Sequence, residues 1–376
     1  MGVSLASRNA TPEFIDLTVL ILTRNEEARI AACIESAMAA VERAKRTGLL
    51  QGVEYLLVDS ASTDRTVEIA SRYPVDVIRL DPSWPLSAGA GSYAGLLVAR
   101  GARTAIVNGD MIIEERWFVE ALPRLQGDVA AVTGLAKEDL SGRSPIERLV
   151  VRYSYAPLSE GAIPPDVASH TRGYSTGTML LRTAEVKAAG SIHPFLRAAE
   201  DHDLRYRLVR AGWRVLDLPV VQGTHFWAEP GGPLELLHYF QTILRNSIGL
   251  GQMARVHLRR DMWLAKAASR PCFGGRALLN GLLALGMTIL ASLHVIGTLV
   301  SLPVLLVALG ADVAIAASTT LRAKRGRVSP GDGLFADLLY PLAFTTVRTL
   351  GFLRGFVARP RSPEDYPRPS VRIDAA

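Results

Sequence analysis

Residues 17–27 have the sequence LTVLILTRNEE, and this stretch decides the fold. Its first six residues form a mainly apolar run that is rich in β-branched side chains. Such a run is typical of a strand that is buried on both faces of a parallel sheet. The polar residues that follow predict a turn into a helix over about residues 26–45. We therefore expect a strand–turn–helix unit with polar side chains at the end of the strand.

The same alternation continues toward the C-terminus. Further strands are predicted at residues 53–58, 75–80 and 105–107, with helices between them at residues 65–72 and 88–100. This order indicates an α/β domain with a mainly parallel sheet. Ligands of such sheets bind at the carboxyl ends of the strands. Three of the predicted strands end in polar motifs, which are TRNEE at 23–27, DSASTD at 59–64 and NGD at 108–110.

The C-terminal part of the chain is more apolar than the rest. Hydrophobic residues make up 49% of the 376 residues, the mean hydropathy is +0.19, and the excess lies after about residue 276. Residues 277–311 contain no charged side chain, and their length suits two helical crossings of roughly 20 residues each. We predict a transmembrane hairpin at 276–321, with its turn near residues 301–303. A buried pair of core helices is the alternative interpretation.

Basic residues flank this apolar segment. Arg276 precedes it, and four basic residues follow it, which are Arg322, Lys324, Arg325 and Arg327. The positive-inside rule then predicts a multi-pass membrane protein with both ends of the hairpin and the N-terminal domain in the cytoplasm. The net charge is +6, but it lies beside apolar segments rather than on an aromatic-lined face. Nucleic acid is therefore not an expected partner.

The predicted organisation has five parts. Residues 231–275 combine apolar and basic side chains, as do helices that lie on anionic lipid. Residues 334–357 are apolar but carry three charges, which favours an interfacial helix over a third crossing. The parts in order are a flexible N-terminus at 1–13, an α/β catalytic domain at 14–230, amphipathic membrane-interface helices at 231–275, the hairpin at 276–321 and, at 322–376, a basic loop, the interfacial or third membrane helix and a polar tail.

A fourth motif completes a known pattern. Glu200-Asp201-His202-Asp203-Leu204 opens a predicted helix that ends at Gly212. Together with residues 19–27, 58–64 and 108–110, it resembles the family 2 glycosyltransferases, and the resemblance covers about residues 15–230. The layout is most similar to the succinoglycan-biosynthesis type, which also carries C-terminal membrane segments. The resemblance implies a Rossmann-like GT-A domain, followed here by the interface helices and the transmembrane hairpin.

The resemblance assigns a set of residues to the nucleotide-sugar donor. Asp59 would accept hydrogen bonds from the base or the ribose, Thr23 and Glu26 would line the nucleotide pocket, and Asn108 would contact the ribose. Arg245, in the amphipathic stretch, is a candidate for a phosphate group of the donor or acceptor. Other interpretations of these residues stay open. Asp59 also suits a turn with an Asx bond, and Thr23 and Glu26 have the spacing of a capping box.

Asp110 is the expected ligand of Mg²⁺ or Mn²⁺. Such oxygen-seeking cations counter the charge of the diphosphate leaving group. The family pattern at this place is Asp-x-Asp, and Asn108 replaces the first carboxylate, which leaves the strength of metal binding open. His225, in the sequence GTHFW at 223–227, is a candidate for a further ligand. The alternative for His225 is an ordinary hydrogen-bonded histidine.

Asp201, next to Glu200, is the candidate general base. An acceptor hydroxyl must lose a proton when it attacks the anomeric carbon, and a helix N-terminus favours the ionised carboxylate. A simple N-cap role is the alternative. Asp203 and Arg205 are expected on a solvated face or in intrahelical pairs. The glycine-rich residues 173–178 resemble the acceptor-side loop of the family.

These features predict an inverting, metal-dependent glycosyltransferase that moves a single sugar to a lipid-linked acceptor in polysaccharide or glycolipid biosynthesis. The Gln-x-x-Arg-Trp motif of processive synthases is absent, because Gln241 and Arg245 are four positions apart and Asn246 stands in place of the aromatic residue. One hairpin also leaves no room for a polymer channel. Transfer to polyprenyl phosphate, which needs no base, is one alternative. An inactive membrane-bound scaffold with the GT-A fold is another. Nucleotidyl transfer is disfavoured because no phosphate loop is visible near the N-terminus.

Overall fold

The computed structural model describes residues 14–139, 178–226, 235–257, 347, 350–358 and 360–367. The chain divides into two compact units. The first unit comprises Met1–Leu196, Glu200–Pro230 and Arg361–Ala376, and the second comprises Arg197–Ala199 and Gly231–Pro360. The predicted hairpin at 276–321 lies outside the described residues, as do residues 173–177 of the predicted acceptor loop.

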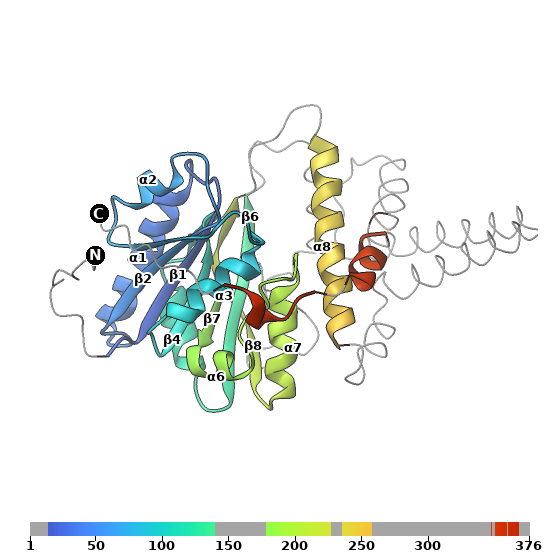
Figure 1. Ribbon diagram of the computed structural model, residues 1–376. Helices are drawn as coiled ribbons and strands as arrows, with labels where there is room; N and C mark the ends of the chain where they lie inside the picture. The colour runs from blue at the N-terminus through green and yellow to red at the C-terminus, as the bar shows by residue number, and fades with distance from the viewer. Residues whose placement is uncertain are drawn as a thin grey trace, which may run out of the picture. The chain divides into compact units, whose positions relative to one another are not determined.

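The first unit is built on one sheet with the strand order β3-β2-β1-β4-β7-β6-β8-β5 (Figure 1). Its strands are β1 Leu17–Thr23, β2 Val53–Asp59, β3 Asp76–Arg79, β4 Arg103–Asn108, β5 Met111–Ile113, β6 Val129–Asp139, β7 Thr178–Arg182 and β8 Arg214–Phe226. Its helices are α1 Ile30–Arg46, α2 Thr66–Ala70, α3 Ala88–Val98, α4 Trp117–Ala121, α6 Thr183–Ala188 and α7 Glu200–Arg210, with short 3-10 turns η1 at Leu122–Arg124 and η3 at Pro363–Asp365.

The sheet is mixed, so the predicted α/β class is confirmed but the mainly parallel pairing holds best for the first half. β3, β2, β1 and β4 run parallel, whereas β7 is antiparallel to both of its neighbours. Strand β5 is antiparallel to β8. Only Gly109 and Asp110 separate β4 from β5.

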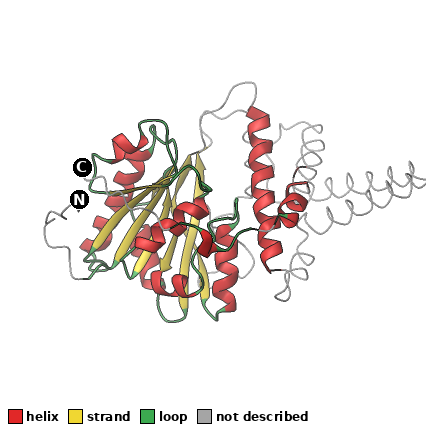
Figure 2. Cartoon of the chain, in the orientation of Figure 1, coloured by secondary structure: helices red, strands yellow, loops and turns green. Residues whose placement is uncertain are grey.

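Helices cover both faces of the sheet, as Figure 2 shows. Alternate side chains of each central strand enter different cores, because the side-chain period of a strand is two. Val19 and Ile21 pack with α1 and α4, while Leu20 and Leu22 pack with α3 and α7. This double burial is the physical reason that residues 17–22 are almost continuously apolar.

Helix α1 begins at Ile30, four residues later than predicted, and its N-cap Arg29 makes no side-chain capping bond. The preceding residues are bonded to the loop after β2 instead. The backbone N–H groups of Asn25 and Glu26 donate to Ser62 Oγ (2.8 Å) and Thr66 Oγ1 (2.7 Å). The capping box of Thr23 and Glu26 is therefore not formed, because tertiary hydrogen bonds take the place of helical ones.

Helix α7 ends as predicted, before Gly212, whose φ of +90° suits glycine. The solvated face predicted for Asp203 and Arg205 is wrong, since both residues are buried. Asp203 does form the predicted kind of intrahelical pair, with Arg207 at 2.7 Å. Arg205 instead forms an ion pair with Asp217 of β8 at 2.6 Å. The reason is that α7 packs on the sheet, and polar groups brought there must be paired.

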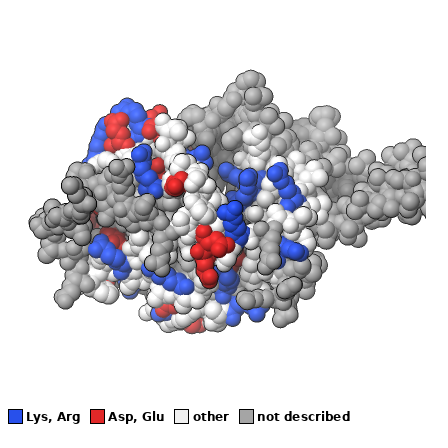
Figure 3. All heavy atoms as spheres, in the orientation of Figure 1, with Lys and Arg blue, Asp and Glu red and all other residues white. Residues whose placement is uncertain are grey.

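Charged side chains otherwise lie mainly on the surface. Basic and acidic groups are interspersed over the described surface that faces the viewer in Figure 3. Several ion pairs are exposed, such as Arg72 with Glu68 at 2.7 Å. Exposed pairs contribute little to stability, so the two cores on either side of the sheet hold the unit together.

The second unit contains α8, Glu235–His257, and a helical segment at residues 350–357. These two segments pack together, and the Arg255 guanidinium lies 5.8 Å from the centre of the Phe356 ring. Within the part of the chain that the structure describes, no helix combines the length and apolar character needed to cross a bilayer.

Candidate active site

The polar motifs meet at the carboxyl edge of the sheet because their strands are parallel and in register. Thr23 of β1 is the direct partner of Asp59 of β2. Leu22 of β1 pairs with Asn108 of β4. Asp59 in turn pairs with Arg79, the last residue of β3. Four neighbouring strands therefore end in one row of residues. Asn108 is in register with Leu22, so its side chain lies on the opposite face of the sheet from those of Thr23 and Asp59.

Asp59 lies at the centre of this row and is fully buried. Its carboxylate accepts a hydrogen bond from the Ser62 backbone N–H, with 3.1 Å to Oδ2 and 3.3 Å to Oδ1. This is the Asx-type turn that the sequence allowed. The Arg79 guanidinium, half exposed, lies 3.7 Å from Asp59 Oδ2. Sequence reasoning missed Arg79, although its place at the end of a predicted strand was a sufficient signal.

Asp110 and His225 form the second part of the site. Asp110 sits in the short link between β4 and β5, and His225 lies near the end of β8. The distance from His225 Nε2 to Asp110 Oδ2 is 3.2 Å. The other carboxylate oxygen, Asp110 Oδ1, is buried without a hydrogen-bond partner among the described residues. The fold thus joins two residues that are 115 positions apart.

Glu26 faces the same place. Burial, and then the negative charge of Asp110, raise the pKa of the Glu26 carboxyl to about 7. Within the described chain, Glu26 Oε2 and Thr23 Oγ1 are also buried without a hydrogen-bond partner. Buried polar atoms normally have partners, and each unsatisfied atom costs about 1–3 kcal/mol. Three such oxygen atoms near one edge indicate a place kept for a ligand.

The chemistry of these groups fits a divalent cation in part. Among the residues that the structure describes, no group of three or more His, Cys, Asp and Glu is arranged to hold a metal ion. Mg²⁺, however, is commonly held by one or two carboxylates together with substrate phosphates and water. Asp110 and His225 form an incomplete ligand set of that kind. The unpartnered Asp110 Oδ1 is the atom that best fits the ion.

Glu200 and Asp201 reach the same edge through α3. The first turn of α3 packs on the ends of β1 and β2, where a methyl group added at Gly91 would lie 3.2 Å from Leu22 Cδ2. A methyl group at Gly89 would lie 3.2 Å from Glu200 Cβ. The Asp201 carboxylate accepts a hydrogen bond from the His202 N–H at 2.8 Å. The start of α7 therefore lies against the first turn of α3.

Residues 12–247 match the family described as Glycosyltransferase like family 2. The chain belongs to this family. It is a glycosyltransferase, and its mixed α/β sheet is consistent with the GT-A fold. No curated protein sequence matches the chain.

Two solved structures illustrate what the chain is similar to. One is the mannosyltransferase PcManGT from Pyrobaculum calidifontis, in complex with GDP-Man and Mn²⁺, with a TM-score of 0.57 and 15% sequence identity. The alignment covers 93% of this chain and 90% of that one. Another is residues 1–349 of TarS from S. aureus, with a TM-score of 0.43, 18% identity and coverage of 66% and 73%.

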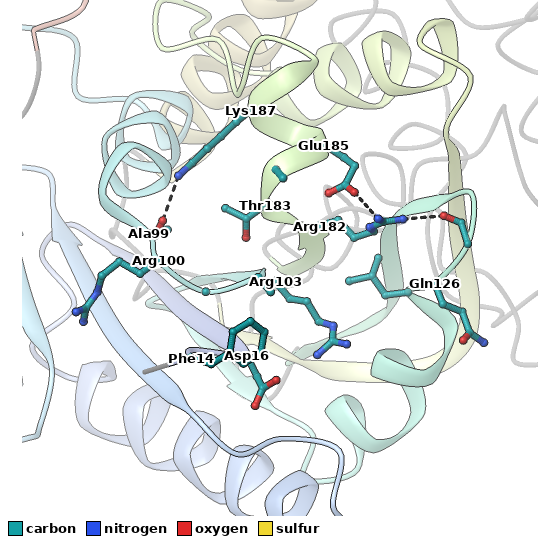
Figure 4. Close-up of a pocket in the computed structure, with 15 residues that line it drawn as sticks. Phe14, Asp16, Ala99, Arg100, Arg103, Gln126, Arg182, Thr183, Glu185 and Lys187 are labelled. Atoms are coloured by element: carbon teal, nitrogen blue, oxygen red, sulfur yellow. Dashed lines mark hydrogen bonds and ion pairs between the residues drawn. The ribbon is translucent and has the colours of Figure 1, made fainter. Parts of the chain in front are cut away.

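A cavity of about 810 Å³ lies at the opposite, amino edge of the glycosyltransferase sheet (Figure 4). Basic side chains line it, but some are already bonded to the protein. Arg182 donates to the Gly127 carbonyl at 2.7 Å, and Lys187 donates to the Ala99 carbonyl at 3.1 Å. The predicted donor residues lie at the other ends of the strands, so this cavity is separate from the candidate active site.

Two predicted parts of the site stay predictions. Arg245 lies on α8, in the second unit, and its role in phosphate binding is not tested. Residues 173–177 of the acceptor-side loop lie outside the described residues, and Thr178 begins β7.

Proposed function

We propose that this glycosyltransferase moves a single sugar from a nucleotide-sugar donor to a lipid-linked acceptor, with inversion at the anomeric carbon and with Mg²⁺ or Mn²⁺ at the diphosphate. The observation that carries the proposal is the group of buried oxygen atoms of Thr23, Glu26 and Asp110 that have no hydrogen-bond partner among the described residues. The Arg29 guanidinium lies 3.7 Å from Glu26 Oε2. The three oxygen atoms lie at the strand ends where α/β sheets bind ligands. A bound donor and cation would satisfy them.

The nucleoside would lie along the row formed by Thr23, Asp59 and Asn108. The Asp59 carboxylate, fixed by the Ser62 N–H, has acceptor capacity left for a base or ribose donor group. Arg79 adds a cation beside it. Because Asp59 is fully buried, a matched donor group would be favoured over one that left this carboxylate unpaired.

Asp110 and His225 would hold the divalent cation. The chemistry that such a cation supplies is neutralisation of the charge that develops on the departing diphosphate. Asp110 keeps His225 oriented through the 3.2 Å contact between Oδ2 and Nε2. Glu26 adds negative potential to the same place, which favours a cation there.

Asp201 would act as the general base, with Glu200 beside it. The acceptor hydroxyl oxygen attacks the anomeric carbon and its proton passes to the Asp201 carboxylate. The bond from the anomeric carbon to the diphosphate oxygen breaks, and its electron pair leaves with the diphosphate. A single displacement of this kind inverts the anomeric centre.

The membrane assignment rests on the sequence. The uncharged residues 277–311 and the basic residues around them support a hairpin, a cytoplasmic catalytic domain and a lipid-linked acceptor. The five-part organisation given by the sequence and the succinoglycan-like specificity belong to the same proposal. Transfer to polyprenyl phosphate is the second candidate, because a phosphate acceptor would also suit a basic membrane-side surface.

The first test is donor hydrolysis by the full-length protein in detergent. GDP-mannose is the first donor to try, because the Pyrobaculum protein was solved with GDP-Man and Mn²⁺. UDP- and dTDP-sugars follow, each with Mn²⁺ or with a chelator. We expect metal-dependent hydrolysis of one donor. No hydrolysis of any donor, together with no metal-dependent nucleotide binding, would support the inactive scaffold instead.

The second test adds acceptors to the donor that is hydrolysed. A lipid-linked saccharide and polyprenyl phosphate are supplied separately, and the product is analysed for its anomeric configuration. Product on the saccharide alone supports the proposal. Product on polyprenyl phosphate alone would replace it with the second candidate.

A further inference from the structure

The chain returns to the first unit after leaving it. Residues 361–367, here called the C-terminal clasp, belong to the same compact unit as the sheet. The short turn η3 lies within the clasp, close to α3 in Figure 1. A capping box of Ser362 and Asp365 stabilises this turn. The clasp is therefore an ordered element of the fold.

Tyr366 anchors the clasp. Its residue surface is only 5% exposed, and its hydroxyl donates to the Pro85 carbonyl at 3.0 Å. Its ring centre lies 5.9 Å from those of Trp84 and Tyr93, in edge-on contacts. Burial, and then Asp81, raise the pKa of the phenol to about 12, so the hydroxyl stays a donor at neutral pH.

The same ring also holds the segment that leads into α7. The centres of the Tyr366 and Phe195 rings are 5.6 Å apart, again edge-on. The Arg361 guanidinium lies 5.9 Å from the centres of both the Trp84 and the Phe195 rings. Aromatic and cation–π contacts of this kind add about 0.5–1.5 kcal/mol each beyond simple burial. The clasp thus joins residues 84–93 to Phe195.

Phe195 stands close to the proposed catalytic carboxylates. The segment that holds Phe195 and the first turn of α7 meet at the same point of α3, because a methyl group at Gly89 would lie 3.2 Å from Glu200 Cβ. On its other side the segment contacts α3, since the Ser87 hydroxyl donates to the Pro194 carbonyl at 3.3 Å. A methyl group at Gly89 would lie 2.8 Å from the His193 carbonyl oxygen. The segment 191–196 is therefore held between α3 and the clasp.

The far part of α7 has its own attachment. Arg205 is bound to Asp217 of β8 by two hydrogen bonds, of 2.6 and 2.9 Å, and Leu204 and Leu208 are buried in the core. The first turn of α7 packs through Glu200 on Gly89 of α3, which also contacts the His193 carbonyl oxygen of the segment 191–196. A loss of the clasp would therefore act on the start of α7 rather than on the whole helix.

We propose that Tyr366 is a positioning residue for glycosyl transfer, which fixes Phe195 and through it the first turn of α7 that carries Asp201. The role of Asp201 rests on the proposed function, whereas the effect of Tyr366 on residues 191–204 does not. Tyr366 touches neither donor nor acceptor in this proposal. It acts from the C-terminal end of the chain, beyond the predicted membrane segments.

The test compares full-length Tyr366→Ala with Tyr366→Phe. We expect Tyr366→Ala to speed hydrogen exchange in residues 191–204 by roughly tenfold or more and to lower kcat of transfer roughly 10- to 100-fold. The donor KM should not change, because the donor row lies on β1 to β4. Tyr366→Phe keeps the ring contacts and loses only the hydrogen bond to the Pro85 carbonyl. Its exchange rates and kcat should therefore stay within about threefold of the wild-type values.

Tyr73→Ala is the matched control. Tyr73 packs on the other face of the sheet and donates to Glu35 at 2.6 Å, so its loss should leave both exchange in 191–204 and kcat unchanged. Unchanged exchange in Tyr366→Ala, or a kcat loss matched by Tyr73→Ala, would overturn the proposal. The exchange measurement needs no substrate. A wild-type protein that transfers no sugar would refute the proposed function, and exchange would still decide whether the clasp orders the start of α7.

Discussion

The two edges of the sheet differ in how their buried carboxylate oxygen atoms are hydrogen-bonded. At the amino edge, the Glu54 carboxylate is buried and accepts three hydrogen bonds, from Thr18 Oγ1 (2.6 Å), the Arg100 backbone N–H (2.7 Å) and Arg100 Nε (2.7 Å). At the carboxyl edge, Asp110 Oδ1 and Glu26 Oε2 accept none from the described residues.

This difference separates stability from function. A buried carboxylate with all its hydrogen bonds stabilises the folded chain, whereas each buried carboxylate oxygen without a hydrogen bond destabilises it by about 1–3 kcal/mol. Such a cost is tolerated where a ligand later supplies the partners. Substitutions at the amino edge should therefore lower stability and spare activity, and substitutions at the carboxyl edge should do the reverse.

The largest effect is expected at the proposed base. Asp201→Asn should lower kcat of transfer to a hydroxyl acceptor roughly 10²–10⁴-fold, because general-base catalysis is lost. Donor binding and Tm should be unchanged, since Asp201 is partly exposed and, among the described residues, its carboxylate bonds only to the neighbouring His202 N–H. Transfer kinetics and nucleotide titration are the measurements. A loss of less than about tenfold would favour a phosphate acceptor, which needs no base.

The next effect concerns the proposed cation. Asp110→Asn should lower metal-dependent donor turnover roughly 10²–10³-fold, because charge at the diphosphate is no longer countered. Its Tm without metal should equal or exceed that of the wild type, because the negative charge of Asp110 beside the Glu26 carboxyl is removed. Turnover over a range of Mn²⁺ concentrations and thermal unfolding with a chelator are the measurements. A clear fall in Tm would mean that Asp110 has a structural role, and the comparison of the edges would fail.

The amino edge should respond in the opposite way. Glu54→Ala should destabilise the first unit by about 2 kcal/mol, because Thr18 Oγ1 and the Arg100 N–H lose their partner. For a domain of this size that is a fall in Tm of about 4–8 °C. Turnover per folded molecule should stay at the wild-type value. The Arg100 guanidinium is half exposed, so its part of the loss is small.

The smallest effect is a pH dependence at Glu26. The pKa of this carboxyl is about 7 in the folded chain against an ordinary value of 4.5. Between these values the folded state binds more protons than the unfolded state, so stability falls as the pH rises and the cost is complete above about pH 7. Glu26→Gln removes this cost. With a chelator present, the variant should be more stable than the wild type by about 1 kcal/mol at pH 8 and equal to it at pH 4.5. Equal stability of the variant and the wild type at both pH values would show that the pKa of Glu26 is not raised in the folded chain.

Local patterns were enough to predict much of the fold and of the site. The apolar run at 17–22 and the polar residues after it fixed the place of β1 and of Thr23, because a doubly buried strand needs a continuous apolar run. The same logic applied to Asp59, Asn108 and Asp110 at the ends of β2 and β4. Arg79 at the end of β3 follows the same rule and was missed only because its motif is a single residue.

The sequence by itself determined strands β1 to β4, the helices between them, helix α7, the polar strand ends and the family, since these depend on residues that are close together in the chain. Only the tertiary structure decided the late start of α1, the burial of Arg205 against Asp217, the contact of Asp110 with His225 and the docking of Tyr366 on Phe195. Each of these contacts joins separate segments of the chain. Local spacing carries no information about them, because the partner is chosen by how the sheet and its helices pack.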